Sequence, residues 1–105
     1  MLGWLRGKRG QGREVVLVTR AGCHLCDEAR AMLEALLAQR REAGLAVPSL
    51  IERDITTDPD WERTFFTTIP VVELGDRRLE LVTSAAKLKV LLATLDERPV
   101  TAAPA

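Results

Sequence analysis

The sequence has few of the residues that bind metals or crosslink secreted proteins. It contains two cysteines, one histidine and no tyrosine among 105 residues. Two cysteines are too few for the disulfide framework of a small secreted domain. They are also too few for a four-ligand zinc site, because His24 is expected to point away from between them and no second histidine exists. These absences leave redox chemistry at the two thiols as the leading function class.

The sequence also lacks an excess of charge and any long apolar run. It has 15 basic and 15 acidic residues, which gives no electrostatic reason to bind nucleic acid or an anionic membrane. No apolar run approaches the ~20 residues of a membrane span, and residues 1–6 do not provide the apolar segment of a signal peptide. We therefore expect a protein of the reducing cytoplasm, without a nucleic-acid or membrane partner.

Composition predicts one domain between two tails. Residues 1–13 combine four basic residues with glycines and no acid, which is typical of a flexible basic arm. Trp4 in this arm offers an alternative interpretation as part of a small docking patch. Residues 98–105 are rich in proline and alanine and are expected to fray. The segment 14–97 is left as a single folded domain.

Both cysteines lie in the motif Cys23-His24-Leu25-Cys26, between an apolar run and a helical pattern. Residues three apart share one helix face, so the two sulfurs can approach within the distance limits of a disulfide. Cys23 is predicted at the helix N-cap, where free backbone N–H groups favour a thiolate. We expect Cys23 to be the exposed nucleophile and Cys26, one turn further on, to resolve the mixed disulfide.

Two basic residues flank the nucleophile. Arg20 would add positive charge near Cys23. His24 has two open interpretations: a solvated first-turn residue, or a cation or donor that stabilises the thiolate when it is protonated.

Apolar periodicity and turn residues predict seven elements in the order β-α-β-α-β-β-α. The strands are expected at 14–20, 49–55, 71–74 and 77–82, and the helices from 23 to Gly44, from Asp58-Pro59, and from Thr83 or Ser84 to Leu95. The first strand is apolar throughout, as in a strand that is buried on both faces. The first two strands should be parallel with a right-handed crossover, and the last two should form a hairpin.

This order and this motif together resemble the thioredoxin superfamily, most closely the small glutaredoxin-like proteins, over about residues 14–95. The resemblance rests on the dithiol motif, on Arg20 three residues before Cys23, and on Ile69-Pro70 just before the third strand. It implies an α/β thioredoxin fold, with a four-stranded mixed sheet flanked by three helices. It also implies a thiol–disulfide oxidoreductase in which Pro70 is cis and faces the dithiol. The residues expected to bind substrate are Arg20, His24, Leu25, Thr68, Ile69 and Pro70.

The resemblance also suggests partners. It implies a monomer without metal or tightly bound cofactor, acting on a disulfide-containing protein or a small thiol. Its electron donor would be glutathione or a thioredoxin reductase system. Glutaredoxins typically carry a Gly-Gly pair and an acid before the last helix, which hold a carboxylate of glutathione. Residues 79–84 read Leu-Glu-Leu-Val-Thr-Ser instead, and this departure argues against glutathione.

Two other function classes stay open at this point. A dimer could share four thiolates and hold a metal ion or an iron–sulfur cluster. Alternatively, the chain could be a non-catalytic adaptor of the same fold that binds a partner through its basic arm or Trp4.

Overall fold

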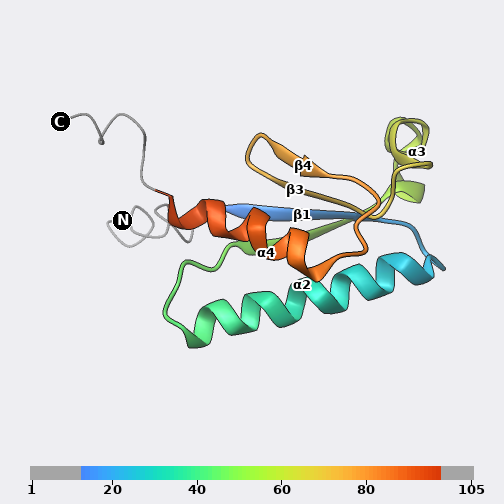
Figure 1. The fold of residues 1–105 in the computed structure, drawn as a ribbon. Coiled ribbons are helices and arrows are strands. Elements are labelled where there is room, and N and C mark those ends of the chain that lie inside the picture. The colour runs from blue at the N-terminus through green and yellow to red at the C-terminus, as the bar shows by residue number, and fades with distance from the viewer. Residues whose placement is uncertain (1–12, 98–105) are drawn as a thin grey trace, which may run out of the picture.

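The structure, a computed structural model, describes residues 13–97. The predicted tail 98–105 and all but Arg13 of the predicted arm 1–13 lie outside this range. The elements follow in the expected order (Figure 1). They are β1 (Glu14–Thr19), α2 (His24–Glu42), β2 (Ser49–Asp54), the 3-10 turn η2 (Ile55–Thr57), α3 (Pro59–Phe65), β3 (Val71–Leu74), β4 (Arg77–Leu79), α4 (Ala85–Ala93) and the 3-10 turn η3 (Thr94–Asp96).

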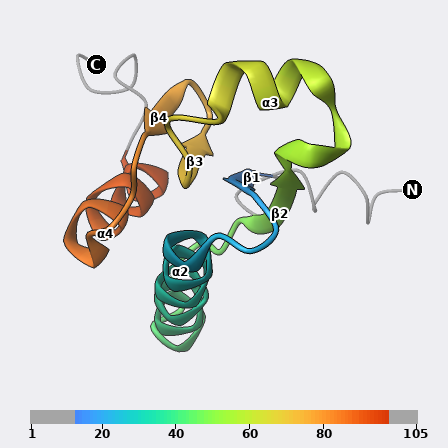
Figure 2. The same ribbon diagram turned by 90° about the vertical axis from the view of Figure 1, so that its right-hand side faces the viewer.

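The four strands form one mixed sheet in the order β2-β1-β3-β4. β1 is parallel to β2, as predicted for strands joined by a long helix, and antiparallel to β3. β3 and β4 form the expected antiparallel hairpin. Helices α2 and α4 cover one face of the sheet, and α3 lies on the other face (Figure 2). The α/β thioredoxin-type arrangement expected from the sequence is therefore confirmed.

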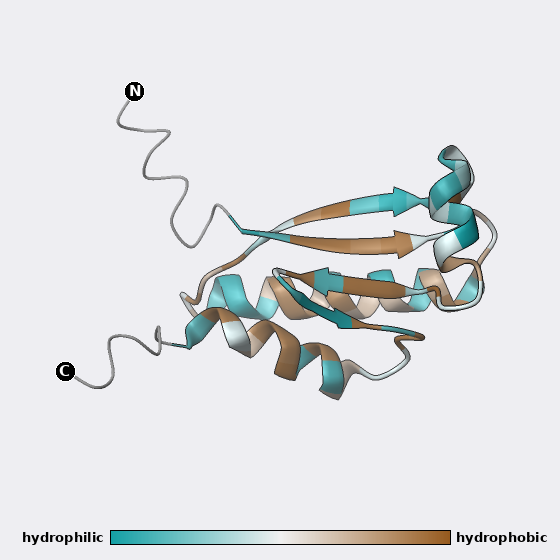
Figure 3. Cartoon of the chain, turned by 90° about the horizontal axis from the view of Figure 1, so that it is seen from above, coloured by the Kyte–Doolittle hydropathy of each residue, from teal (hydrophilic) through white to brown (hydrophobic). Residues whose placement is uncertain are grey.

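β1 is the centre of the core. Because side chains alternate along a strand, Val15 and Leu17 pack in a cluster with α2 and α4, whereas Val16 and Val18 pack in a second cluster on the α3 side. This is why β1 carries no polar break, and its hydrophobic colour runs along almost its whole length in Figure 3. The second cluster also contacts Trp61 of α3.

Helix α2 begins at Cys23, its N-cap, and its chain reverses beyond the C-terminus at Gly44. Gly44 has a φ of +75°, a conformation that glycine adopts without steric cost. Apolar residues at helical spacing predict a buried stripe on each of two helices, including Leu25 on α2 and Ala85 on α4. Both of these members are wrong. Leu25 is 47% exposed, because it lies in the first turn of α2, beyond the sheet. Ala85 is exposed next to Ser84, the N-cap of α4.

The predicted strand 77–82 is too long, because β4 ends at Leu79. Leu81 has a φ of +51°, which turns the chain away from β3. Its backbone N–H donates to Thr68 O at 2.9 Å, and the N–H of Val82 donates to Pro70 O at 3.0 Å. The backbone of this segment is thus bonded to the loop before β3 instead of to β3 itself.

Arg30 on α2 links this helix to strand β2. Its Nε donates to Glu52 Oε1 at 2.8 Å, and its Nη1 donates to Asp27 Oδ1 at 2.9 Å. The hydroxyl of Thr19 donates to the other oxygen of Glu52 at 2.9 Å. The Arg30 guanidinium is the main reason why the pKa of Glu52 lies below its usual range, since it favours the ionised carboxylate. The Glu52 contact likewise raises the pKa of Arg30.

We expect this linkage to make stability depend on pH. A lowered pKa in the folded state contributes stability above the unfolded pKa, which is lost as pH falls through the folded pKa. The free energy of unfolding of the parent chain, measured in urea, should therefore fall as the pH is lowered below about 5. Glu52→Gln should be less stable at pH 7 by about 1 kcal/mol or less, because the pair is partly exposed, and should depend less on pH. Glu34→Gln, at an exposed position of α2, is the control; identical pH profiles for Glu52→Gln and the parent chain would contradict the assignment.

Among residues 13–97, no helix is both long enough and apolar enough to cross a membrane.

Candidate active site

The two cysteines lie where β1 passes into α2. The chain turns at Ala21-Gly22, with Gly22 at a φ of +79°, and the Cys23 N–H donates to Arg20 O at 3.1 Å. Cys23 is the N-cap of α2, as predicted, and Cys26 lies in its first turn. Their Cα atoms are 5.2 Å apart, and the sulfurs are joined in a disulfide. The pair is therefore shown in its oxidised form.

The two sulfurs have different surroundings. Cys26 is fully buried, at 0% exposure, whereas Cys23 is only partly buried. The backbone N–H of Cys26 donates to Cys23 Sγ at 3.1 Å. This donor and the helix N-terminus both favour negative charge on the Cys23 sulfur once the disulfide is reduced.

The loop before β3 forms a second wall at the same end of the sheet. Val71 pairs with Val18 near the end of β1, so Ile69-Pro70 lies beside the residues that lead to Cys23. The Ile69-Pro70 peptide is cis, as expected, and Pro70 is fully buried. In Figure 1 this loop, the start of α2 and the segment after β4 all lie at the right-hand end of the sheet.

The backbone N–H of Ile69 already forms a hydrogen bond within the protein. It donates to Phe65 O at 3.1 Å, at the end of α3. Thr68 donates from its N–H and its hydroxyl to the same carbonyl, and its own carbonyl accepts from Leu81. The Ile69 N–H therefore already has an acceptor within the protein.

The two basic residues beside Cys23 lie near acidic side chains on the surface. Arg20 Nη2 lies 3.7 Å from Glu62 Oε2 on α3, with both side chains about half exposed. The side chain of His24 is 88% exposed, and its Nε2 lies 3.5 Å from Glu28 Oε2. The Arg20 charge is therefore shared with a carboxylate. The position of His24 fits the solvated interpretation better than that of a donor to the sulfur.

A family model for the glutaredoxin-like domain (DUF836) matches residues 14–96. This match includes the dithiol, the cis-proline loop and all four strands. The chain belongs to the glutaredoxin-like domain family.

Solved structures share the fold of this glutaredoxin-like domain. The structural-genomics target XcR50 from X. campestris superposes with a TM-score of 0.60 at 24% identity, covering 76% of this chain and 96% of that one. Chloroplastic thioredoxin z gives a TM-score of 0.58 at 15% identity, over 90% and 88% of the two chains. Mitochondrial thioredoxin 3 from Saccharomyces cerevisiae gives 0.52 at 14% identity, over 91% and 89%. No curated protein matches the sequence significantly.

Fold, family and the C-x-x-C pair together support a redox role of the thioredoxin and glutaredoxin type. Within residues 13–97, no three or more His, Cys, Asp or Glu side chains are placed to hold a metal ion.

Sequence reasoning missed two apolar residues at this end of the sheet. Phe66, the C-cap of α3, and Leu81, whose N–H bonds the loop before β3, are each 57% exposed. A signal for Phe66 was present, because Trp61 and Phe65 already occupy the inner face of α3 and leave the next residue outside. No such signal exists for Leu81, whose exposure follows from its positive φ.

Proposed function

We propose that this glutaredoxin-like domain is a thiol–disulfide oxidoreductase in which Cys23 attacks and Cys26 resolves. The observation that carries the proposal is the contrast between the two sulfurs. Cys23 is accessible and accepts an N–H at the helix start, whereas Cys26 is fully buried. An attacking thiol needs access and thiolate character, and a resolving thiol needs neither until the mixed disulfide has formed.

The proposed reaction balances over two exchanges. The Cys23 thiolate attacks one sulfur of a substrate disulfide, which forms a mixed disulfide and releases the first substrate thiolate. The Cys26 thiolate then attacks Cys23 Sγ, releases the second substrate thiolate and forms the Cys23–Cys26 disulfide. Two electrons pass to the substrate. The product is the form in which the pair is seen here.

We favour a protein disulfide over a glutathione disulfide as the substrate. Leu25, Phe66 and Leu81 place exposed apolar side chains at the end of the sheet that holds the dithiol. Leu81 and Glu80 also lie in the segment that lacks a Gly-Gly pair. Such a surface suits a polypeptide with apolar residues near its disulfide. We further propose that the protein acts as a reductase in the cytoplasm.

Insulin reduction tests the proposal, with NADPH and a thioredoxin reductase supplied in one arm and glutathione with its reductase in the other. We expect turnover in the first arm and slower turnover in the second. Turnover in neither arm, with the dithiol fully reduced at the start, would count against catalysis.

Removing the apolar side chains should affect protein substrates selectively. We expect Phe66→Ala with Leu81→Ala to raise KM for insulin about tenfold, from the lost burial of two side chains. The rate with hydroxyethyl disulfide should not change. Leu45→Ala is the matched control, since Leu45 is 45% exposed beyond the opposite end of α2. An equal effect of Leu45→Ala, or none from the pair, would show that the substrate does not use this surface.

A further inference from the structure

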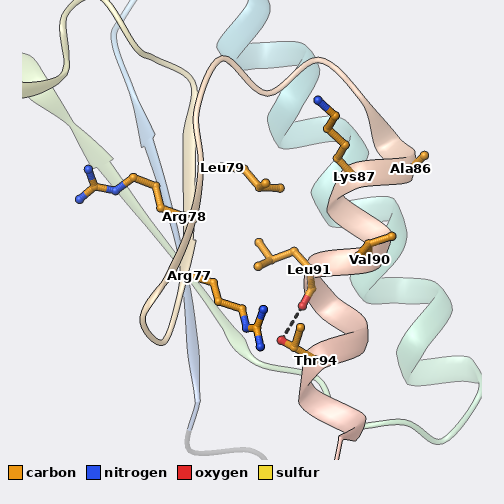
Figure 4. A pocket seen from close by; sticks show the side chains of 8 residues that line it. All are labelled: Arg77, Arg78, Leu79, Ala86, Lys87, Val90, Leu91 and Thr94. Atoms are coloured by element: carbon orange, nitrogen blue, oxygen red, sulfur yellow. Dashed lines mark hydrogen bonds between the residues drawn. The ribbon is translucent and has the colours of Figure 1, made fainter.

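A groove of about 550 Å³ runs between the edge strand β4 and helix α4 (Figure 4). Leu79 and Leu91 point into it from the strand and the helix, and Val90, 71% exposed, lies at its helix side. Lys87 lies near Leu79 at one end, and Arg77 lies near Thr94 at the other. The groove is thus apolar in its middle and basic at both ends.

Strand and helix periodicity explain this arrangement. Arg77 and Leu79 are two apart on β4 and point toward α4, whereas Arg78 points to the other face. There Arg78 pairs with Glu73 at 2.8 Å and lies over the Phe65 ring. On α4, the residues that line the groove are spaced by three and four and form one stripe. They are Ala86, Lys87, Val90 and Leu91, and the stripe continues to Thr94 in the adjoining turn η3.

The charge of the groove is unbalanced. The two ionisable lining residues that face it, Arg77 and Lys87, are both basic, whereas Arg78 points away and pairs with Glu73. Among residues 13–97, Lys87 forms no ion pair, and Arg77 approaches only Glu97, at 3.9 Å with both side chains exposed. A ligand that brings carboxylates to the two ends would supply the missing negative charge.

β4 also has an open edge. It pairs with β3 on one side, and no other strand of the described part pairs with it on the other. An edge strand presents N–H and C=O groups that an extended peptide can pair with. This favours a polypeptide over a lipid, which has no backbone to offer.

We propose that this β4–α4 groove binds an extended segment of a partner protein with the pattern acid-x-apolar-x-acid. Alternate residues of an extended chain face the same way, so the three specified side chains would all point toward α4. The two acids would lie ~13 Å apart along the segment. The two basic ends of the groove are marked by Lys87 and by Thr94, next to Arg77, and these two residues are ~10.5 Å apart along the helix axis. The long side chains of Lys87 and Arg77 cover the difference. The apolar residue would pack against Leu79 and Val90.

The test is a titration of the full-length, ¹⁵N-labelled chain with the peptide acetyl-Thr-Glu-Thr-Val-Thr-Glu-Thr-amide. We expect saturable shifts of the amide signals of Leu79 and Val90. The same peptide with lysine in place of both glutamates should not produce them. Arg77→Glu with Lys87→Glu should weaken binding about tenfold or more. Lys87→Glu alone should fold like the parent chain, because an acid suits the first turn of a helix, so a loss of binding in this variant cannot be due to unfolding.

Lys89→Glu is the matched control. It makes the same charge change on the same helix, but Lys89 lines a different cavity, beside Leu36 and Arg40. The proposal is overturned if the glutamate peptide causes no saturable shifts, or if the lysine peptide causes the same shifts. It is also overturned if Lys89→Glu weakens peptide binding as much as the double variant Arg77→Glu with Lys87→Glu. It is equally overturned if another occupant is found. Dodecanoate shifting these amides without the peptide doing so would indicate a lipid. Changes in these amide signals when the protein is diluted would indicate a second copy. Amide signals of residues 98–105 that differ between Lys87→Glu and the parent chain, both without peptide, would indicate the chain's own C-terminal segment.

Discussion

Cys23→Ser should abolish disulfide reduction, with a loss of about three orders of magnitude or more relative to the parent chain. A serine hydroxyl does not ionise in the range where a thiol does, so the helix start has no anion to stabilise at that position. The effect is expected to be nearly complete because the remaining cysteine, Cys26, is fully buried. The measurement is insulin reduction under the donor that supports the parent chain.

Cys26→Ser should behave differently, because it removes the second step and keeps the first. Cys23 can still attack, and the mixed disulfide then has no internal thiol to resolve it. We expect this variant to accumulate covalent adducts with a disulfide substrate, detected as a mass increase that dithiothreitol removes. Cys23→Ser should form none. Adducts in Cys23→Ser that are missing in Cys26→Ser would reverse the two roles.

This pair of variants also separates an enzyme from an adaptor of the same fold. An adaptor that binds through a surface remote from the dithiol should retain its partner in both variants. A trapped, reducible adduct formed only through Cys23 would exclude that interpretation for the partner concerned. A metal-sharing dimer, by contrast, should lose its metal in either cysteine variant.

The sequence predicted the parts of the fold that depend on local patterns. The β1 run from Val15 to Val18 indicated a central strand. Asp58-Pro59 and Thr83 or Ser84 indicated helix starts, and the N-caps are Asp58 and Ser84. The contrast between Cys23 and Cys26 followed from their positions at the start of one helix. Each of these predictions depends only on residues within one helical turn or one strand.

The errors lie where tertiary contacts decide. Leu81 lies in an apolar stretch that fits a strand, and β4 stops before it because of its positive φ and its hydrogen bond to Thr68. The groove beside β4 was not predictable either, because it depends on how closely α4 lies against the sheet edge. A pattern in one segment holds no information about the distance to another.

Arg40 is the clearest example of this limit, and its ion pair leads to the second large expected effect. By position it is a basic residue in the last turn of α2, which suits the helix dipole and is usually solvated. In the structure it is only 8% exposed. Its Nε donates to Ala46 O at 2.6 Å, and its Nη2 donates to Asp96 Oδ1 at 2.6 Å. Arg40 therefore joins three segments: α2, the loop after it and the turn η3 that ends the described chain.

Asp96→Asn should destabilise the fold by about 2 kcal/mol, because it leaves a buried guanidinium without its counter-charge. The figure is below that for a fully buried pair because Asp96 is partly exposed. Replacing both partners, as Arg40→Met with Asp96→Asn, should recover part of this loss, since no buried charge is then left unpaired. Urea unfolding of the single and double variants measures the coupling. Arg41→Met, at the exposed neighbouring position, should change stability by no more than about 0.5 kcal/mol. If Asp96→Asn were as mild as Arg41→Met, the pair would be an ordinary surface contact, and the closure of α2 against η3 would have to come from apolar packing alone.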